Sequence, residues 1–219
     1  GNVLIKDFTY IFLRGSRIGI TGANGCGKST LMNIISGNIK PSSGEVTIGQ
    51  TVKISYFAQE NESLDNSMRV IDYIREGGEV VKTSDGTVSA SVMLERFLFP
   101  PEQQYSLIGR LSGGEKRRLY LLRILMEAPN VLLLDEPTND LDITTLTVLE
   151  DYLDTFDGIV ITVSHDRYFL DRTVTRILSF EENGVIKQYE GGYTDYINAS
   201  GRKLAVTGNI NNTKDFTKP

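Results

Sequence analysis

The chain has 219 residues, of which 40% are hydrophobic and 23% are charged, and its formal net charge is −5. This length and composition allow a full hydrophobic core, so we expect one globular unit with at most one subdomain. The acidic balance argues against a broad basic surface for nucleic acid, and no hydrophobic stretch is long enough to cross a bilayer. The single cysteine, Cys26, excludes a disulfide framework, and no secretory pattern opens the chain, so we expect a cytoplasmic location.

The first quarter of the chain predicts a strand, a glycine-rich loop and a helix, followed by two further strands. The hydrophobic run RIGIT at residues 17–21 leads into the loop at residues 22–30, and a helical pattern covers residues 28–36. Two alternating runs at residues 45–49 and 52–57, separated by a Gly-Gln pair, predict antiparallel strands.

The middle of the chain, residues 60–127, predicts a mostly helical subdomain. Helical patterns are expected over residues 69–75, 89–97 and 113–127. Between the first two helices, residues 80–88 predict a small hairpin that turns at Ser84-Asp85-Gly86.

The last part of the chain returns to an alternation of strands and helices. We expect strands at residues 131–134 and 159–163, helices at 143–156 and 166–171, and a hairpin formed by 174–180 and 185–189. Such alternation predicts an α/β fold with a mostly parallel core sheet and an antiparallel β edge. The predicted organisation is a core in two parts, residues 1–59 and 128–199, around the helical subdomain, followed by a linker or disordered tail at 200–219.

The glycine-rich loop has the pattern of a phosphate-binding loop, because GANGCGKS fits G-x-x-x-x-G-K-[ST] without a gap. Glycines let successive backbone N–H groups converge on a phosphate, and the following helix adds its positive N-terminal end. Lys28 can reach the β- and γ-phosphates, and the Ser29 hydroxyl suits Mg²⁺. An ATP site here would use Gly22, Asn24, Gly25, Cys26, Gly27, Lys28, Ser29 and Thr30. The alternative is a glycine-rich turn before a helix.

Two acids follow the run VLLL at residues 131–134, which is hydrophobic on both faces and predicts a central strand. The carboxyl end of such a strand opens on the ligand in α/β sheets. Asp135 suits a water-mediated contact to Mg²⁺, and Glu136 suits polarising the water that attacks the γ-phosphate. Carboxylates at a strand end are often only a helix cap or a turn, but the phosphate loop and Pro137 favour the catalytic interpretation.

The only histidine, His165, follows the predicted strand at residues 159–163. Because the carboxyl ends of parallel strands gather at one edge of a sheet, we expect it near Glu136. A lone histidine is more often structural than catalytic, so position alone does not assign its role.

The segment LSGGE at residues 111–115 precedes the long predicted helix. Ser112 and the N–H groups of Gly113 and Gly114 can form an anion site at the helix start. Taken alone, the pentapeptide would be only a helix cap. Basic residues follow where a first helical turn generally prefers acids, and an anion site tolerates them and can use them. These residues are Lys116, Arg117 and Arg118.

Together, GANGCGKST, LSGGE and VLLLDEP resemble the nucleotide-binding domain of the ABC ATPase superfamily over nearly the whole chain. The resemblance implies a P-loop NTPase fold, with ATP and Mg²⁺ bound and ATP hydrolysed to ADP and phosphate. It also implies that Gln59 contacts Mg²⁺ and the attacking water, and that His165 senses the γ-phosphate. The segment Ser112, Gly113, Gly114 and Glu115 would close over ATP bound by an opposing domain, so hydrolysis would need two domains head to tail.

Two segments narrow the resemblance. DEPTNDLD at residues 135–142 and the block at residues 164–196 are similar to the ABC-F family, the tandem ATPases that work on ribosomes. Asp140, where most members have His, the FLF segment at residues 97–99 and the small hairpin resemble the second ATPase domain of Uup-type proteins. The family implies a second ABC domain in the full-length chain, and contact with a ribosome or structured RNA or DNA through regions outside this sequence. It places the aromatic residue that stacks on adenine upstream of Gly1.

Two other function classes stay open. The runner-up is the motor subunit of a membrane transporter, which would dock the membrane part near Gln59. A third reading is a structural ATP-binding domain without turnover, which the presence of Glu136 and His165 weakens.

Overall fold

A computed structural model describes residues 3–59, 64–83, 86–139 and 141–201. Its centre is a six-stranded sheet in the order β2-β5-β6-β1-β7-β8. The strands are β1 (Arg17–Thr21), β2 (Ile54–Phe57), β5 (Val131–Asp135), β6 (Ile159–Val163), β7 (Arg176–Phe180) and β8 (Ile186–Glu190). The first five strands of that order run parallel, and β8 pairs antiparallel with β7 at the edge. The predicted parallel core with an antiparallel edge is confirmed.

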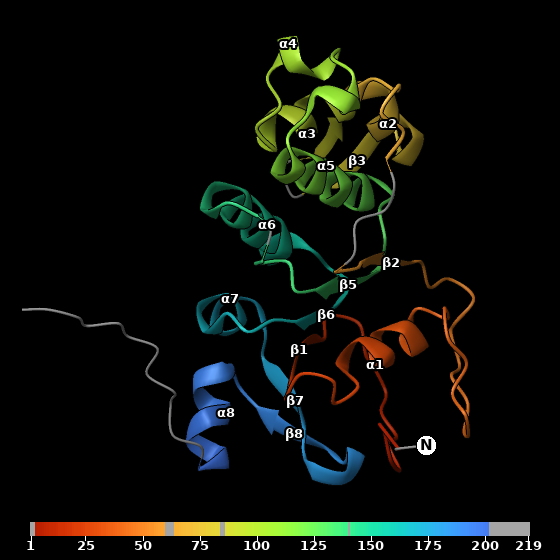
Figure 1. The fold of residues 1–219 in the computed structure, drawn as a ribbon, viewed down its shortest axis with the longest axis vertical. Coiled ribbons are helices and arrows are strands. Elements are labelled where there is room, and N and C mark those ends of the chain that lie inside the picture. The colour runs from red at the N-terminus through yellow and green to blue at the C-terminus, as the bar shows by residue number, and fades with distance from the viewer. Residues whose placement is uncertain (1–2, 60–63, 84–85, 140, 202–219) are drawn as a thin grey trace, which may run out of the picture.

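Helices cover both faces of this sheet, and the side-chain alternation of β5 shows which helix covers which face. Leu133 packs in one hydrophobic cluster with Leu31 of α1 (Lys28–Ile35). Its neighbours Leu132 and Leu134 pack in the opposite cluster with Leu149 of α6 (Ile143–Thr155). All five residues of β5 are buried, as expected for a central parallel strand. Figure 1 shows α1 apart from α6, α7 (Arg167–Thr173) and α8 (Tyr193–Ser200).

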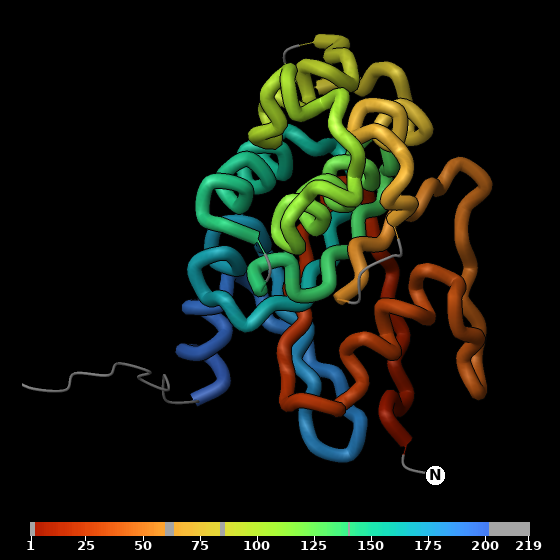
Figure 2. The backbone as a smooth tube through the Cα atoms, turned by 45° about the horizontal axis from the view of Figure 1, so that its top comes forward, coloured from red at the N-terminus to blue at the C-terminus, as the bar shows by residue number. Residues whose placement is uncertain are grey.

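A second group of elements lies at the end of the molecule opposite the β7–β8 hairpin (Figures 1 and 2). It contains α2 (Val70–Gly77), the antiparallel pair β3 (Val80–Thr83) and β4 (Gly86–Ser89), α3 (Ala90–Arg96), α4 (Pro101–Gln104), a 3₁₀ turn at Ile108–Arg110 and α5 (Gly113–Met126). Its hydrophobic side chains share one continuous cluster with the α6 face of the sheet. The small hairpin is confirmed, but Ser84 and Asp85 of its predicted turn lie outside the described residues.

Predicted strands around residue 50 were partly wrong. β2 begins at Ile54 and pairs in parallel with β5, and residues 45–49 form no strand. Val46 and Ile48 are each 45% exposed, so the alternation that predicted a strand has no buried face here. A period-2 pattern indicates a strand only where a partner strand and a covering layer exist.

The prediction missed α8, whose polar sequence YTDYINAS shows little periodicity. Tyr196 and Ile197 are nevertheless buried against Leu170 and Ile177. Tertiary packing therefore supplies what local propensity lacks. Asp140 and residues 202–219 lie outside the described residues. No helix in the described part of the chain is long and hydrophobic enough to span a membrane.

Candidate active site

The predicted phosphate loop connects β1 to α1 and depends on glycine at Gly22. This residue has φ of 154°, and a Cβ atom there would lie 2.7 Å from Cβ of Phe180 and 2.9 Å from Sγ of Cys26. Gly27, the N-cap of α1, is also left-handed, offers no side-chain cap and is followed by no acid in the first turn. The first N–H groups of α1 are therefore not capped by a local side chain, which is the arrangement that an anion requires.

Lys28 folds back onto this loop. Its Nζ donates to the carbonyl oxygens of Gly22 and Ala23, each at 3.0 Å. Neutral carbonyls hold the ammonium group at the loop without cancelling its charge, so a phosphate can replace them. Asn24, Gly25 and Ser29 are exposed on the same loop and helix start, and the side chain of Thr30 is partly buried.

The two acids after β5 have different surroundings. Asp135 is 2% exposed and its Oδ2 accepts a hydrogen bond of 3.0 Å from the Tyr56 hydroxyl. Glu136 is 6% exposed, and its φ of 50° places a non-glycine residue in the left-handed region. Its backbone N–H donates to the Val163 carbonyl at 2.9 Å, which fixes this turn against the end of β6. Such a conformation costs on the order of 1 kcal/mol and is typical of functional sites.

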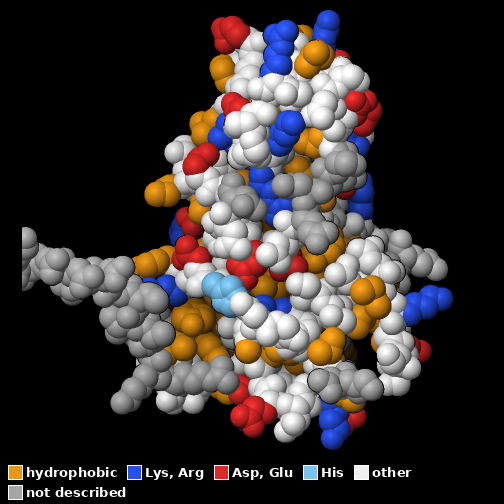
Figure 3. All heavy atoms as spheres, in the orientation of Figure 1, with side chains coloured by type: hydrophobic (Ala, Val, Ile, Leu, Met, Phe, Trp, Pro, Cys, Tyr) orange, Lys and Arg blue, Asp and Glu red, His pale blue; other side chains and the backbone are white. Residues whose placement is uncertain are grey.

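Glu136 and His165 are brought together as predicted from the strand order. Nε2 of His165 lies 3.3 Å from Oε1 of Glu136, and Oε2 of Glu136 is buried without a hydrogen-bond partner among the described residues. Burial raises the pKa of Glu136 above its ordinary value, while His165 opposes this shift and Asp135 adds to it. Figure 3 shows the histidine beside acidic side chains at the surface. A buried acid with a raised pKa and an unused oxygen can accept a proton.

At the start of α5, the side chains of Ser112 and Glu115 are hydrogen-bonded to each other. The Ser112 hydroxyl accepts from the Glu115 N–H at 3.3 Å, and Glu115 Oε2 accepts from the Ser112 N–H and hydroxyl, each at 2.8 Å. Gln103 donates to the other Glu115 oxygen at 2.6 Å. These bonds lower the pKa of Glu115, and the backbone bond from Ser112 contributes most. Glu115 thus completes a capping box.

Gly113 and Gly114 sit in open space. No atom of the described residues lies within 4 Å of a Cβ built at either position. Both residues are exposed, and Figure 1 shows α5 well separated from α1 and its phosphate loop. Nothing in the described residues requires glycine at these two positions, in contrast to Gly22.

Two of the basic residues after this segment do not face an anion site, which corrects the sequence interpretation. Arg117 is 2% exposed, stacks 3.8 Å from the centroid of Phe57 and donates to the Ala58 carbonyl at 2.7 Å. Arg118 is also buried and pairs with Asp142, with Nη1 and Oδ2 3.0 Å apart. Lys116 instead bonds Asn66. The triplet had predicted surface charge because sequence alone does not show which helix face is covered.

Gln59 follows the carboxyl end of β2, the neighbour of β5 in the sheet, and its side chain is exposed. Arg117 fixes the backbone immediately before it. The sequence interpretation assigned Arg117 to an anion site, and it missed Tyr56, which belongs to no recognisable motif.

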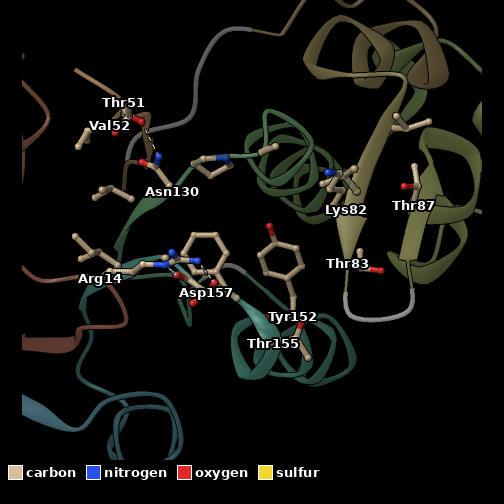
Figure 4. Close-up of a pocket in the computed structure, with 18 of the residues that line it drawn as sticks. Arg14, Thr51, Val52, Lys82, Thr83, Thr87, Asn130, Tyr152, Thr155 and Asp157 are labelled. Carbon is tan, nitrogen blue, oxygen red and sulfur yellow. Dashed lines mark hydrogen bonds and ion pairs between the residues drawn. The ribbon is translucent and has the colours of Figure 1, made fainter. Parts of the chain in front are cut away.

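A hollow of about 1060 Å³ lies at the amino-terminal ends of the core strands, opposite the end at which Glu136 and His165 follow β5 and β6. It contains none of the predicted site residues. Figure 4 shows it between the β3–β4 hairpin and the segments that precede β2, β5 and β6. Asn130 ties these segments together by donating to the Thr51 carbonyl at 2.7 Å and accepting from the Lys53 N–H at 2.8 Å. Volume alone would select this hollow, but it lacks a convergent set of reactive groups. The candidate active site is therefore the carboxyl edge of the sheet, where the carboxyl-terminal ends of the parallel strands lie.

A family model described as "ABC transporter" matches residues 5–139. The chain is 57% identical over 207 residues to "Uncharacterized ABC transporter ATP-binding protein YfmR" of Bacillus subtilis, covering 94% of this chain and 33% of that protein. It is 42% identical to "Energy-dependent translational throttle protein EttA" of Escherichia coli, covering 93% and 37%, and 42% identical to "ATP-binding protein Uup" of the same species, covering 89% and 31%. The chain thus spans about a third of the length of these relatives.

Solved structures share the fold. An "ATP binding subunit of ABC transporter" superposes with a TM-score of 0.73 at 18% identity, covering 90% of this chain and 87% of that one. The ATP-binding cassette MJ0796, a dimer bound to ADP and phosphate, superposes with a TM-score of 0.66 at 23% identity, covering 85% and 90%. At these identities the likeness supports the fold alone.

Proposed function

The chain belongs to the ABC transporter family as an ATP-binding domain, and we propose that it hydrolyses ATP to ADP and phosphate with Mg²⁺ at the carboxyl edge of its sheet. The observation that carries the proposal is the meeting of Glu136 and His165 beside a phosphate loop, with one buried Glu136 oxygen unpartnered among the described residues. An unsatisfied buried carboxylate oxygen is unfavourable unless a ligand uses it.

In this proposal the loop binds the phosphates of ATP. Lys28 exchanges the carbonyls of Gly22 and Ala23 for β- and γ-phosphate oxygens, and the uncapped N-terminus of α1 donates its N–H groups. Asn24, Gly25 and Ser29 are exposed, which leaves room for the nucleotide.

The residues present also fit Mg²⁺. Ser29, Gln59 and Asp135 offer a hydroxyl, an amide oxygen and a carboxylate, which are the hard oxygen donors that this ion prefers. The described residues hold no cluster of three or more His, Cys, Asp or Glu that could bind a metal unaided. The ion is therefore expected to arrive with the phosphates, with Asp135 acting through water, and to neutralise charge that develops on them.

Glu136 acts as the general base. It takes a proton from water as the water oxygen bonds to the γ-phosphorus, and ADP leaves with the electron pair of the broken phosphorus–oxygen bond. The contact with His165 orients the carboxylate, and a raised pKa brings its proton affinity closer to that required at neutral pH.

The segment of Ser112, Gly113, Gly114 and Glu115 serves the ATP of a facing domain. Support comes from Gly113 and Gly114, which are exposed in open space although nothing in the described part of their own chain requires glycine. A phosphate of a second domain could approach these N–H groups closely. Two domains would thus form two composite sites head to tail.

A dilution series tests the pairing. The ATPase rate per molecule should rise with protein concentration, because the competent species is a dimer governed by mass action. Ser112→Arg should remove this rise while leaving ATP affinity almost unchanged. A high rate that does not depend on concentration would rule out the two-domain mechanism.

For the full-length protein, we propose an ABC-F role on ribosomes, which also implies a cytoplasmic location. The support is similarity to EttA, whose name describes a translational throttle, and the length of the relatives, which leaves room for a second ATPase domain. A full-length Glu136→Gln variant, with its counterpart changed too, should sediment with ribosomes in ATP and block translation. Absence from ribosomes together with co-purification of a membrane permease would support the transporter-motor alternative.

A further inference from the structure

We propose that Tyr56 is a positioning residue for the metal: its hydroxyl holds one oxygen of Asp135 so that the other remains available to a water on Mg²⁺. This inference rests on the proposed Mg-ATP site. The supporting contact is the hydrogen bond of 3.0 Å from the Tyr56 hydroxyl to Oδ2 of Asp135.

The sheet order creates this contact. Strands β2 and β5 are parallel neighbours, and their register pairs Tyr56 with Leu133. Leu133 and Asp135 are two residues apart, so their side chains leave the same face of β5. The Tyr56 ring packs in the cluster of Leu133 and α1, and its hydroxyl reaches along the strand to the carboxylate.

The environment of Asp135 gives this bond its importance. The residue is 2% exposed, and in the described part of the chain no other side chain donates a hydrogen bond to its carboxylate. A buried carboxylate without a fixed donor could adopt several rotamers or recruit a cation of the protein. A tyrosine hydroxyl donates one hydrogen bond and brings no positive charge, so Asp135 keeps the negative charge that attracts Mg²⁺.

Tyr56 itself is well anchored. Its backbone lies in the β2–β5 ladder, and the Tyr120 hydroxyl donates to its carbonyl at 3.3 Å. The neighbouring ring of Phe57 stacks with Tyr120 and lies under Arg117. The Tyr56 backbone is thus fixed by β5 and α5, and its ring packs in the cluster of Leu133, which is the requirement for a residue that positions another.

Tyr56→Phe tests the inference because it removes only the hydroxyl. The measurement is the affinity for ATP in EDTA and in a series of Mg²⁺ concentrations. Affinity in EDTA should stay within about twofold of wild type. The gain in affinity that Mg²⁺ provides should fall roughly 10- to 150-fold, the range expected for one hydrogen bond to a charged group. Tyr120→Phe removes a hydroxyl of α5 that bonds the Tyr56 backbone carbonyl and not Asp135. Because the β2–β5 ladder still holds that backbone, this variant should keep the full gain.

A purely structural role would move both affinities equally, or only the melting temperature, and either result would overturn the inference. A double-mutant cycle gives a second readout that does not depend on Tyr56→Phe being as stable as wild type. In an Asp135→Asn background, Tyr56→Phe should cause almost no further loss of the Mg²⁺ gain, since the two residues act through one contact. Additive losses would show that Tyr56 acts elsewhere. If wild type itself bound ATP equally with and without Mg²⁺, the proposed Mg-ATP site would fail first.

Discussion

Glu136 at the carboxyl edge and Glu115 at the start of α5 are the same residue type in opposite situations. Glu115 accepts hydrogen bonds on both oxygens and its pKa is lowered. Glu136 is buried in a left-handed conformation, leaves one oxygen unpartnered among the described residues and has a raised pKa. The carboxylate of Glu115 has hydrogen-bond donors for both oxygens, whereas in the described part of the chain that of Glu136 does not.

This difference suggests how the two halves of a composite site are built. The half that performs chemistry keeps polar groups in an unfavourable state until a nucleotide arrives. The half offered to a partner, at the start of α5, must keep its shape without that partner. Its Ser112 and Glu115 side chains are therefore hydrogen-bonded to each other. Each of the following variants sharpens or breaks this contrast.

Replacing Lys28 should have the largest effect. Lys28→Ala should nearly abolish Mg-ATP binding, because it removes the cation that reaches the phosphates, while stability changes little. Calorimetry checks the affinity, and Lys40→Ala, at an exposed lysine, is the control. Unchanged affinity in Lys28→Ala would show that the loop at residues 22–30 is not the ATP-binding site.

Replacing Glu136 should affect rate more than binding. Glu136→Gln should still bind ATP but hydrolyse it about 10²- to 10⁴-fold more slowly, the usual loss for one positioned general base. Single-turnover assays of the full-length protein measure this, with Glu45→Gln as a surface control. Wild-type turnover in Glu136→Gln, together with loss in Asp135 or His165 variants, would move the role to another group.

Glu115→Gln should lower stability by about 1 kcal/mol through loss of the capping box. A lowered folded-state pKa means that ionised Glu115 stabilises the fold above the ordinary value of 4.5, and that this contribution is lost as pH falls through the folded-state pKa. The difference from wild type should therefore shrink in acid. Denaturant unfolding across pH measures it. Glu102→Gln, at an exposed glutamate in the first turn of α4, is the matched control variant.

The smallest effect should have the opposite sign. For Glu136 the folded-state pKa is raised, so its contribution to stability is greatest below the ordinary pKa and is lost as pH rises through the folded value. Without nucleotide and in EDTA, Glu136→Gln should be more stable than wild type at pH 8, by about 1 kcal/mol or less. The gain should disappear toward pH 4. A loss of stability at pH 8 would mean that the ionised carboxylate is well satisfied, and the contrast with Glu115 would not hold.

Much of the fold could be read from hydrophobic runs and glycine signals. The bounds of β1 and β6 were predicted without error, since a buried parallel strand is a short continuous hydrophobic run. The strand order then brought His165 toward Glu136. Residues 45–49 and α8 were misjudged because their state depends on tertiary partners and not on local pattern.

The contact between Tyr56 and Asp135 could not be predicted for a different reason. The two residues are 79 positions apart, and they meet only because β2 lies beside β5 in the sheet. A sequence pattern identifies a carboxylate at a strand end but gives no neighbour for it. The buried face of Arg117 was hidden in the same way.

The backbone of Glu136 has a further consequence for how mutation and selection act on this position. A left-handed residue is most easily glycine or asparagine, which would also remove a buried charge. Selection for folding alone would thus drive the position away from glutamate, whereas selection for turnover would retain it. A variant library sorted once for stability and once for ATP hydrolysis should therefore differ most at this codon. The difference would identify Glu136 as a position of stability–activity trade-off in the domain.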